Sequence, residues 1–288
     1  SSYTFLFLIF SILRINSQTT SKTCLVCASE GLRSRWSLTG LPISSISDSQ
    51  FSSECDNLSN GIPSSIQRQS CSGPCYTYMF DDPDSRSDSP SILYIRGCHD
   101  EMTGVVSDRL TSGGATNGMF CEYDSTYSRP DSRGKIVTSR TLVEFCGTIE
   151  DGCNKRYKMP SSSGTNDVCN GQTYNNTLSG SLLNCYECSK DSGSCNESRC
   201  YKKYCSKAVV AMKGEYSIRK MCSNVNVLGL DNACSMTDVI TVPGGNLAVT
   251  MKYTQCYCKD KQYCNGDQYI HQSYIIFFII SSITSLLI

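Results

Sequence analysis

Short apolar stretches alternate with polar positions along the chain, and turns that contain Gly separate them. In the C-terminal half, residues 208–212 and 216–222 flank one such turn, and residues 238–242 and 247–256 flank another. This pattern predicts two β-hairpins. No long segment shows the 3.6-residue period of an amphipathic helix, so the chain is predicted to be all-β.

The N-terminal half carries longer hairpins of the same design. Tyr76, Tyr78 and Phe80 alternate toward an Asp- and Ser-rich tip at 81–90, and residues 91–96 lead back. The second hairpin is predicted from a strand at 122–128, a tip at 129–134 and a strand at 135–145. Cysteines bound the hairpins of the C-terminal half, so each of those is expected to be a finger rooted in a disulfide-rich base.

The N-terminal end indicates a secreted route. Residues 3–13 (YTFLFLIFSIL) are apolar and have the length of a signal-peptide core, and small or polar residues follow near Ser17 and Gln18. The stretch is too short to span about 30 Å of hydrocarbon. We therefore predict a signal peptide at 1–17, with its first residues missing because no initiator Met is present.

The C-terminal end resembles a lipid-attachment signal. Residues 274–288 (YIIFFIISSITSLLI) are apolar and lack the basic flank of a spanning helix. Small residues at 265–267 and a polar spacer precede them, as in a glycosylphosphatidylinositol (GPI) signal whose tail is removed. We predict a propeptide at 266–288 and attachment at Asn265, with a short single-pass helix as the other interpretation. The alternative attachment residues are Gly266, Asp267 and Ser273.

Cysteine is the most informative residue type. Twenty cysteines form two runs of ten, and each run opens with Cys-x-x-Cys and closes with Cys-Asn. An even number at this density is typical of disulfides made in an oxidising compartment. Only 39% of the chain is hydrophobic, so small domains here need such covalent support. We predict two modules, at 18–170 and 185–265, joined by a charge-free linker at 171–184.

Charge and sequons add to this picture. N-glycosylation sequons at Asn57, Asn175 and Asn196 agree with passage through the secretory pathway. The formal net charge is zero, with 26 basic and 26 acidic residues, so no global field favours nucleic acid or an anionic membrane surface. Recognition of a partner is therefore expected to be local.

The second module resembles a domain of the LU family (lymphocyte-antigen-6 and urokinase-receptor type). Its cysteines follow the family's order, and QCYCKDKQYCNG at 255–266 is similar to the family's closing signature, although Tyr257 separates two cysteines that are usually adjacent. The resemblance implies an all-β, disulfide-rich fold of two tandem three-finger (snake-toxin-like) domains. In this module it implies the bridges Cys185–Cys205, Cys188–Cys195, Cys200–Cys222, Cys234–Cys256 and Cys258–Cys264.

The first module shows the same order with longer insertions. By resemblance its bridges are Cys24–Cys75, Cys27–Cys55, Cys71–Cys98, Cys121–Cys146 and Cys153–Cys169. The spacing leaves open an exchange of partners among Cys146, Cys153 and Cys169. The family also implies that the Asn after the last cysteine of each module, Asn170 and Asn265, binds backbone at the base of the fingers.

Catalytic and metal chemistry are not expected. The Cys-x-x-Cys spacings would suit zinc in a cytosolic chain, but the secreted route and the even cysteine count favour disulfides. His99, beside Asp100 and Glu101, is interpreted as a surface histidine and not as a general base. If all cysteines pair, no thiolate nucleophile is left. We predict a protein that is not an enzyme and has no metal and no cofactor.

Three loop features are candidates for contact with a partner or an ion. The acidic tip lacks the spacing of a helix-loop-helix calcium site and is interpreted as solvated. The basic tip suits an anionic partner. Trp36, between Arg33 and Arg35, is interpreted as an exposed interface anchor, or else as packing over a disulfide. The acidic tip comprises Asp81, Asp82, Asp84 and Asp88, and the basic tip Arg129, Arg133 and Lys135.

Together these features predict a GPI-anchored glycoprotein on the extracellular side of the cell membrane. It is expected to bind or modulate an extracellular or membrane protein, such as a receptor, channel or ligand, through its loops, and not to bind nucleic acid. Deletion of 81–90 or 129–134 is expected to change partner binding and leave surface expression intact. The alternative is a structural, trafficking or matrix-organising surface protein without a dedicated ligand.

Overall fold

The computed structural model places two sheets and the short helices around them. Its described residues are 22–41, 46–58, 61–85, 91–110, 118–132, 136–147, 151–155, 159, 182–190, 195–196, 198–212, 215–241 and 249–266. The two apolar ends, at 3–13 and 274–288, lie outside these ranges, as does most of the predicted linker. Within the described ranges no helix has the length and apolar character needed to cross a membrane.

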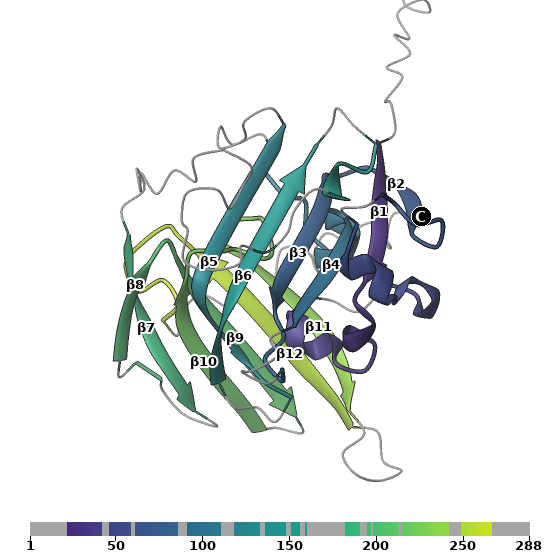
Figure 1. Cartoon of the computed structure of the whole chain (residues 1–288). Coiled ribbons are helices and arrows are strands. Elements are labelled where there is room, and N and C mark those ends of the chain that lie inside the picture. The colour runs from purple at the N-terminus through teal and green to yellow at the C-terminus, as the bar shows by residue number, and fades with distance from the viewer. Residues whose placement is uncertain are drawn as a thin grey trace, which may run out of the picture.

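The first domain is a six-stranded antiparallel sheet in the order β2-β1-β4-β3-β6-β5 (Figure 1). Three hairpins, β1–β2, β3–β4 and β5–β6, form its fingers. The strands are β1 (Lys22–Ala28), β2 (Gln67–Cys71), β3 (Cys75–Asp81), β4 (Ile92–Cys98), β5 (Met119–Pro130) and β6 (Ile136–Cys146). Its helices are α1 (His99–Thr103) and the 3-10 turns η1 (Glu30–Leu32), η2 (Trp36–Thr39), η3 (Asp48–Gln50), η4 (Ser53–Asp56) and η5 (Cys153–Lys155).

The second domain repeats this plan with shorter loops. Its sheet has the order β11-β12-β9-β10-β7-β8, again from three consecutive hairpins. The strands are β7 (Leu183–Lys190), β8 (Ser198–Lys202), β9 (Tyr204–Met212), β10 (Glu215–Ser223), β11 (Ala233–Thr241) and β12 (Val249–Cys258). The fold is therefore two tandem disulfide-rich three-finger domains, which confirms the predicted fold class.

All four predicted hairpins are present, as β3–β4, β5–β6, β9–β10 and β11–β12. Sequence patterns missed β1, β2, β7 and β8. Strands β2 (QRQSC) and β8 (SRCYK) are edge strands of mainly polar residues, so they carry no apolar alternation to detect. Their pairing comes from neighbouring strands and disulfides and not from their own hydrophobic pattern.

The two sheets stack face to face and share one hydrophobic core (Figure 1). From the first domain, Tyr76, Tyr78 and Phe80 on β3 point into it, and from the second domain Tyr204 and Tyr257 do so. Each of these five rings is at most 1% exposed. Full burial of a large apolar side chain stabilises a fold by about 1.5–3 kcal/mol, so the shared core holds the domains together as one body.

A second core covers the opposite face of the first sheet. Leu25, Met79, Tyr94 and Leu142 belong to it, and the loop that carries η4 closes over it through Cys55 and Leu58. Every residue from Cys75 to Phe80 is consequently buried, whichever face of β3 it occupies. The first sheet is thus covered on both sides by described residues.

Candidate functional site

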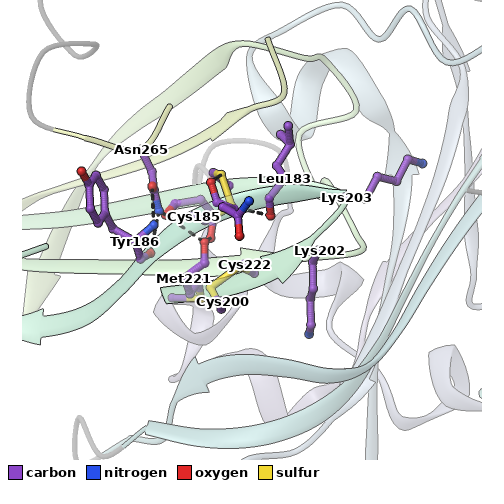
Figure 2. The surroundings of a disulfide bond; sticks show 12 residues. Leu183, Cys185, Tyr186, Cys200, Lys202, Lys203, Met221, Cys222 and Asn265 are labelled. Atoms are coloured by element: carbon purple, nitrogen blue, oxygen red, sulfur yellow. Dashed lines mark hydrogen bonds between the residues drawn. A yellow bond between two sulfur atoms is a disulfide. The ribbon is translucent and has the colours of Figure 1, made fainter. Parts of the chain in front are cut away.

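The hairpins of the second domain meet in a palm, the disulfide-rich base where its strands diverge (Figure 2). The amide of Asn265 fills the gap between them. Its Oδ1 accepts a hydrogen bond from the Tyr186 backbone N–H at 3.0 Å, and its Nδ2 donates to the backbone oxygens of Tyr186 at 2.9 Å and Ser206 at 3.0 Å. These bonds replace ladder bonds that diverging strands cannot make. Asn265 has the palm role that the resemblance implies.

The first domain contains the same arrangement, built by Asn154. Its Nδ2 donates to the backbone oxygens of Leu25 at 2.9 Å and Tyr76 at 3.2 Å, and its Oδ1 accepts from the Leu25 N–H at 3.0 Å. Leu25 and Tyr76 directly follow the two cysteines of one disulfide, as Tyr186 and Ser206 do in the second domain. The palms are therefore equivalent, atom for atom, at this amide.

The sequence predicted Asn170 in this role, and the described residues show Asn154 there. Asn170 lies outside the described residues, and Asn154 performs the role. The sequence held a usable signal, because Cys153-Asn154 is a second Cys-Asn pair in the first cysteine run. Cys146 and Cys153 are 7 residues apart, one more than Cys258 and Cys264.

The disulfides of the second domain join the same pairs as the resemblance implies. They are Cys185–Cys205, Cys188–Cys195, Cys200–Cys222, Cys234–Cys256 and Cys258–Cys264. The Cys200–Cys222 bridge lies beside the Asn265 amide network in Figure 2. The palm is therefore fixed by covalent and hydrogen bonds together.

In the first domain, three implied bridges are present and two are not. The bridges Cys24–Cys75, Cys27–Cys55 and Cys71–Cys98 have the implied partners. Cys146 pairs with Cys153, so the predictions Cys121–Cys146 and Cys153–Cys169 are wrong. Cys121 is also in a disulfide, and Cys169 lies outside the described residues.

Strand register explains the error. In the second domain Cys234 on β11 lies opposite Cys256 on β12, two residues before Cys258. In the first domain Cys121 on β5 lies opposite Glu144, two residues before Cys146. Glu144 thus occupies the place of the missing cysteine, which leaves Cys146 free to close the palm with Cys153.

The acidic tip is tied into the first domain. Arg35 donates to Asp82 and Asp84 at 2.8 Å each, and Arg140 donates to Asp81 at 2.7 Å. These carboxylates are therefore paired with described cations, which corrects the interpretation of a solvated loop. The fourth carboxylate, Asp88, lies outside the described residues.

The first residue of the basic tip, Arg129, is also held inside the first domain. Arg129 is 2% exposed, and its guanidinium lies 3.8 Å from the centroid of the Phe80 ring. It donates to Ser139 Oγ at 2.7 Å and to Thr141 Oγ1 at 2.6 Å. Arg129 is thus a core residue. The other two members, Arg133 and Lys135, lie outside the described residues.

Trp36 is likewise internal. It is 7% exposed, its Nε1 donates to the Leu41 carbonyl at 3.0 Å, and its ring meets Phe51 edge to face with centroids 5.9 Å apart. The expectation of an exposed interface anchor is therefore wrong. Trp36 is part of the shared core, and Phe51 packs against that core.

His99 is buried at the junction between the domains, not at the surface. Its ring is fully covered and lies between Tyr76 and Phe145, with centroids 5.2 and 5.1 Å away. Nε2 donates to the carbonyl of Leu228 in the second domain at 2.8 Å, which fixes the neutral tautomer. Burial lowers the pKa of His99 to about 4, although the Leu228 carbonyl and Asp100 act in the opposite direction.

This burial predicts acid sensitivity. An unfolded His99 takes up a proton near pH 6.5, whereas the folded one resists protonation down to about pH 4. Folding stability should therefore fall as the pH drops between these values, by about 3 kcal/mol in total. Urea unfolding of the wild type and His99→Gln at several pH values would measure this, because the variant should lose that part of the pH dependence. Parallel curves for the two proteins would contradict it.

A polar cluster of opposite charges joins the domains beside the shared core. Glu122 on β5 is buried, and its Oε1 accepts hydrogen bonds from Lys203 and from the Tyr204 hydroxyl. Its Oε2 accepts from the Asn226 backbone N–H at 2.8 Å. Among the described residues, all hydrogen-bond partners of this carboxylate belong to the second domain, so Glu122 links the two domains.

Two further ion pairs lie beside Glu122. Asp124, on the same face of β5, accepts from Lys202 at 2.9 Å and from the Asn224 backbone N–H at 2.8 Å. Arg109 donates to Asp231 at 2.6 Å. Burial lowers the pKa of Arg109, but Glu122 and Asp231 outweigh it, so the net pKa is raised. The junction is therefore charged, paired and specific in geometry.

The outer face of the second sheet is the one described sheet face that neither core covers. Registered neighbours across four strands place Val209 and Met236 in one row, and Tyr216 and Lys252 in the next. Tyr216 and Met236 are 42% and 45% exposed. We call these four residues the outer patch. An exposed aromatic and an exposed Met beside a cation are the composition of a contact surface.

Comparison with known proteins places the first domain in a family. Residues 27–155 match the family model described as a Caenorhabditis elegans ly-6-related protein. The first domain is a Ly-6-related domain. Neither the comparison with curated proteins nor that with solved structures found a match. The family match confirms the resemblance to LU-type domains.

The limits of the match agree with the palm geometry. The Ly-6-related segment ends at Lys155, directly after Cys153 and Asn154, and not at the later Cys169. The predicted end of the first module at residue 170 stays a prediction. A Ly-6-related domain built on disulfides is typical of an extracellular or surface protein.

Two of the three sequons lie within the described residues. Asn57 and Asn196 are exposed, whereas Asn175 lies outside the described ranges. Asn196 Oδ1 accepts a hydrogen bond from Lys220 at 2.7 Å, and an N-linked glycan is attached at Nδ2. That contact is compatible with glycosylation, which stays a prediction at all three positions.

Proposed function

We propose that this chain is a GPI-anchored cell-surface glycoprotein that binds or modulates a protein partner and does no chemistry on it. The match of residues 27–155 to the Ly-6-related family carries the proposal. A disulfide-built palm in each domain and a paired junction between the domains support it, because a rigid scaffold reduces the entropy that binding must overcome.

The contact surface is the outer patch and not the two charged tips. Asp81, Asp82 and Arg129 make internal contacts, so they are poor candidates for partner recognition. Deletion of 81–90 or 129–134 would remove those contacts and disturb folding, contrary to the expectation of intact surface expression. Tyr216 and Met236, by contrast, make no such internal contact among the described residues.

Lipid attachment is proposed at Asn265 or shortly after it. The Asn265 side chain is held in the palm, and lipid transfer uses the carboxyl end of the attachment residue. Gly266, Asp267 or Ser273 would place the same lipid a little farther from the palm. The C-terminal peptide of the purified protein would identify the residue by its mass.

One experiment tests anchor and contact surface together. Phosphatidylinositol-specific phospholipase C should release the protein from transfected cells, and the released protein should bind membranes of the source organism. A Tyr216→Ser, Met236→Ser double variant should bind at least about tenfold more weakly, since contact residues of this type dominate binding energy. The matched control is Tyr201→Ser, because Tyr201 is 55% exposed on β8 and outside the patch.

The outcomes separate the parts of the proposal. Failure of release would refute the lipid anchor. Equal binding by the double variant and the control would refute the outer patch as the contact surface. Absence of any binding would favour the alternative, a structural, trafficking or matrix-organising surface protein without a dedicated ligand.

A further inference from the structure

A small cavity lies between the two domains, away from the outer patch. Its volume is about 20 Å³, and the loop around Leu38, strand β5 of the first domain and strands β9, β10 and β12 of the second form its walls. A cavity of this kind needs about 10–15 Å³ to hold one water-sized particle. There is room for one small occupant and not for an organic ligand.

Arg219 on β10 is the first unusual feature of its wall. Among the described residues it takes part in no hydrogen bond and no ion pair, and its Nε is buried without an acceptor. Burial lowers the pKa of Arg219, and the opposing effect of Tyr253 and Tyr127 is too weak to reverse that shift. An uncompensated guanidinium of this kind is costly and calls for an unseen partner.

A second guanidinium, that of Arg129, lines the same cavity from the first domain. Its hydrogen-bond acceptors are the hydroxyls of Ser139 and Thr141 and, at 3.3 Å, the carbonyl of Leu38. All three acceptors are neutral, and no ion pair of the described residues includes Arg129. A buried cation, Arg129, and a half-buried one, Arg219, thus face one space without a carboxylate in its lining.

Gln255 on β12 supplies an uncharged hydrogen-bond donor at the cavity wall. It is 3% exposed, and its Oε1 accepts a hydrogen bond from the Tyr253 hydroxyl at 2.8 Å. That bond leaves the amide nitrogen Nε2 as the free end, and Nε2 is buried without an acceptor. The cavity therefore presents donors from both domains and lacks an acceptor to match them.

We propose that this cavity binds a small monovalent anion, with chloride as the extracellular ion of suitable size and abundance. Its ligands are the guanidinium of Arg219, the amide of Gln255 and the remaining N–H groups of Arg129. A single water could accept two of these hydrogen bonds but would offset neither positive charge. Because the ligands come from both domains, the anion also links the two sheets.

The test uses the full disulfide-bonded protein. Thermal unfolding is followed at constant ionic strength while sodium gluconate, whose anion is too large for the cavity, is replaced by sodium chloride. For a millimolar dissociation constant, about 150 mM chloride should raise the melting temperature by on the order of 5 °C. Equal melting temperatures in the two salts would overturn the proposal.

Two variants locate the effect. Arg219→Met should fold at least as well as the wild type in gluconate, because it removes an unpaired charge, and should lose the response to chloride. Arg68→Met is the matched control, since Arg68 is exposed on β2, and it should keep the response. A chloride response that survives in Arg219→Met would place the ion elsewhere.

Direct observation gives an independent answer. Crystals grown in sodium bromide should show an anomalous peak within contact distance of Arg219 and Gln255. A water molecule at that position in bromide-grown crystals would overturn the proposal even if some variant failed to fold.

Discussion

Replacing Glu122 by Ala should destabilise both domains at once, by about 3–5 kcal/mol. The substitution removes the acceptor of Lys203, of the Tyr204 hydroxyl and of the Asn226 backbone N–H. The Tyr204 hydroxyl and the Asn226 N–H stay buried without a partner, and the half-buried Lys203 loses its counter-charge at the same time, so the combined effect is strongly destabilising. Urea unfolding with the disulfides intact would measure the change.

The sole tryptophan makes the coupling visible. Trp36 reports on the first domain by fluorescence, whereas far-UV circular dichroism follows both sheets. In the wild type the two signals should change together, because the shared core and the hydrogen bonds of Glu122 link the domains. In Glu122→Ala both transitions should move to lower urea.

Two matched variants sharpen this prediction. Glu122→Gln keeps an acceptor for Tyr204 and Asn226 but withdraws the negative charge from Lys203, so its effect should be intermediate. Glu187→Ala removes an exposed carboxylate from β7 and should change stability by no more than about 0.5 kcal/mol. A fluorescence transition that stays in place while the dichroism shifts would contradict a coupled junction.

The fold could be predicted from the sequence where the signal was local. Hairpins such as β9–β10 combine β-branched and apolar runs with a Gly turn, and both hydrophobic pattern and turn chemistry act over a few residues. The disulfides of the second domain have short, family-like spacings. The hairpin pattern and the cysteine spacing can both be recognised without knowledge of the rest of the molecule.

The position of several candidate residues could not be predicted because it depends on residues distant in the sequence. His99, Trp36 and Arg129 have polar or charged neighbours in sequence, which is typical of exposed loops. Trp36 and Arg129 are covered by Phe51 and Phe80 of their own domain, and His99 by Leu228 of the second domain, 129 residues later. Local composition carries no record of a sheet that packs from so far along the chain.

The charged tips show the same limit on a smaller scale. Asp82 finds its partner in Arg35, 47 residues earlier, and Asp81 finds Arg140, 59 residues later. A run of acidic residues is usually solvated, so only the register of the fingers shows that these form ion pairs. The contact surface consequently moves from the loops to the outer patch, whose rows follow from strand pairing.

Asn154→Ala should cost on the order of 3–5 kcal/mol in unfolding free energy, whereas Asn170→Ala should cost no more than about 0.5 kcal/mol. The Asn154 amide is fully buried and serves both backbone groups of Leu25 and the carbonyl of Tyr76. Strand β1 pairs with β4 only at Cys27 and Ala28, so Leu25 has no ladder partner on that side. Without the amide, these backbone groups stay buried and unsatisfied.

Urea unfolding of both variants would give the comparison, with Asn265→Ala as the counterpart in the second palm. Asn265 makes the same set of backbone bonds, so its removal should cost a similar amount. Equal losses for Asn154 and Asn265, with none for Asn170, would show that the first domain closes at Cys153-Asn154. A large loss for Asn170→Ala with a small one for Asn154→Ala would return the palm to the end of the first cysteine run.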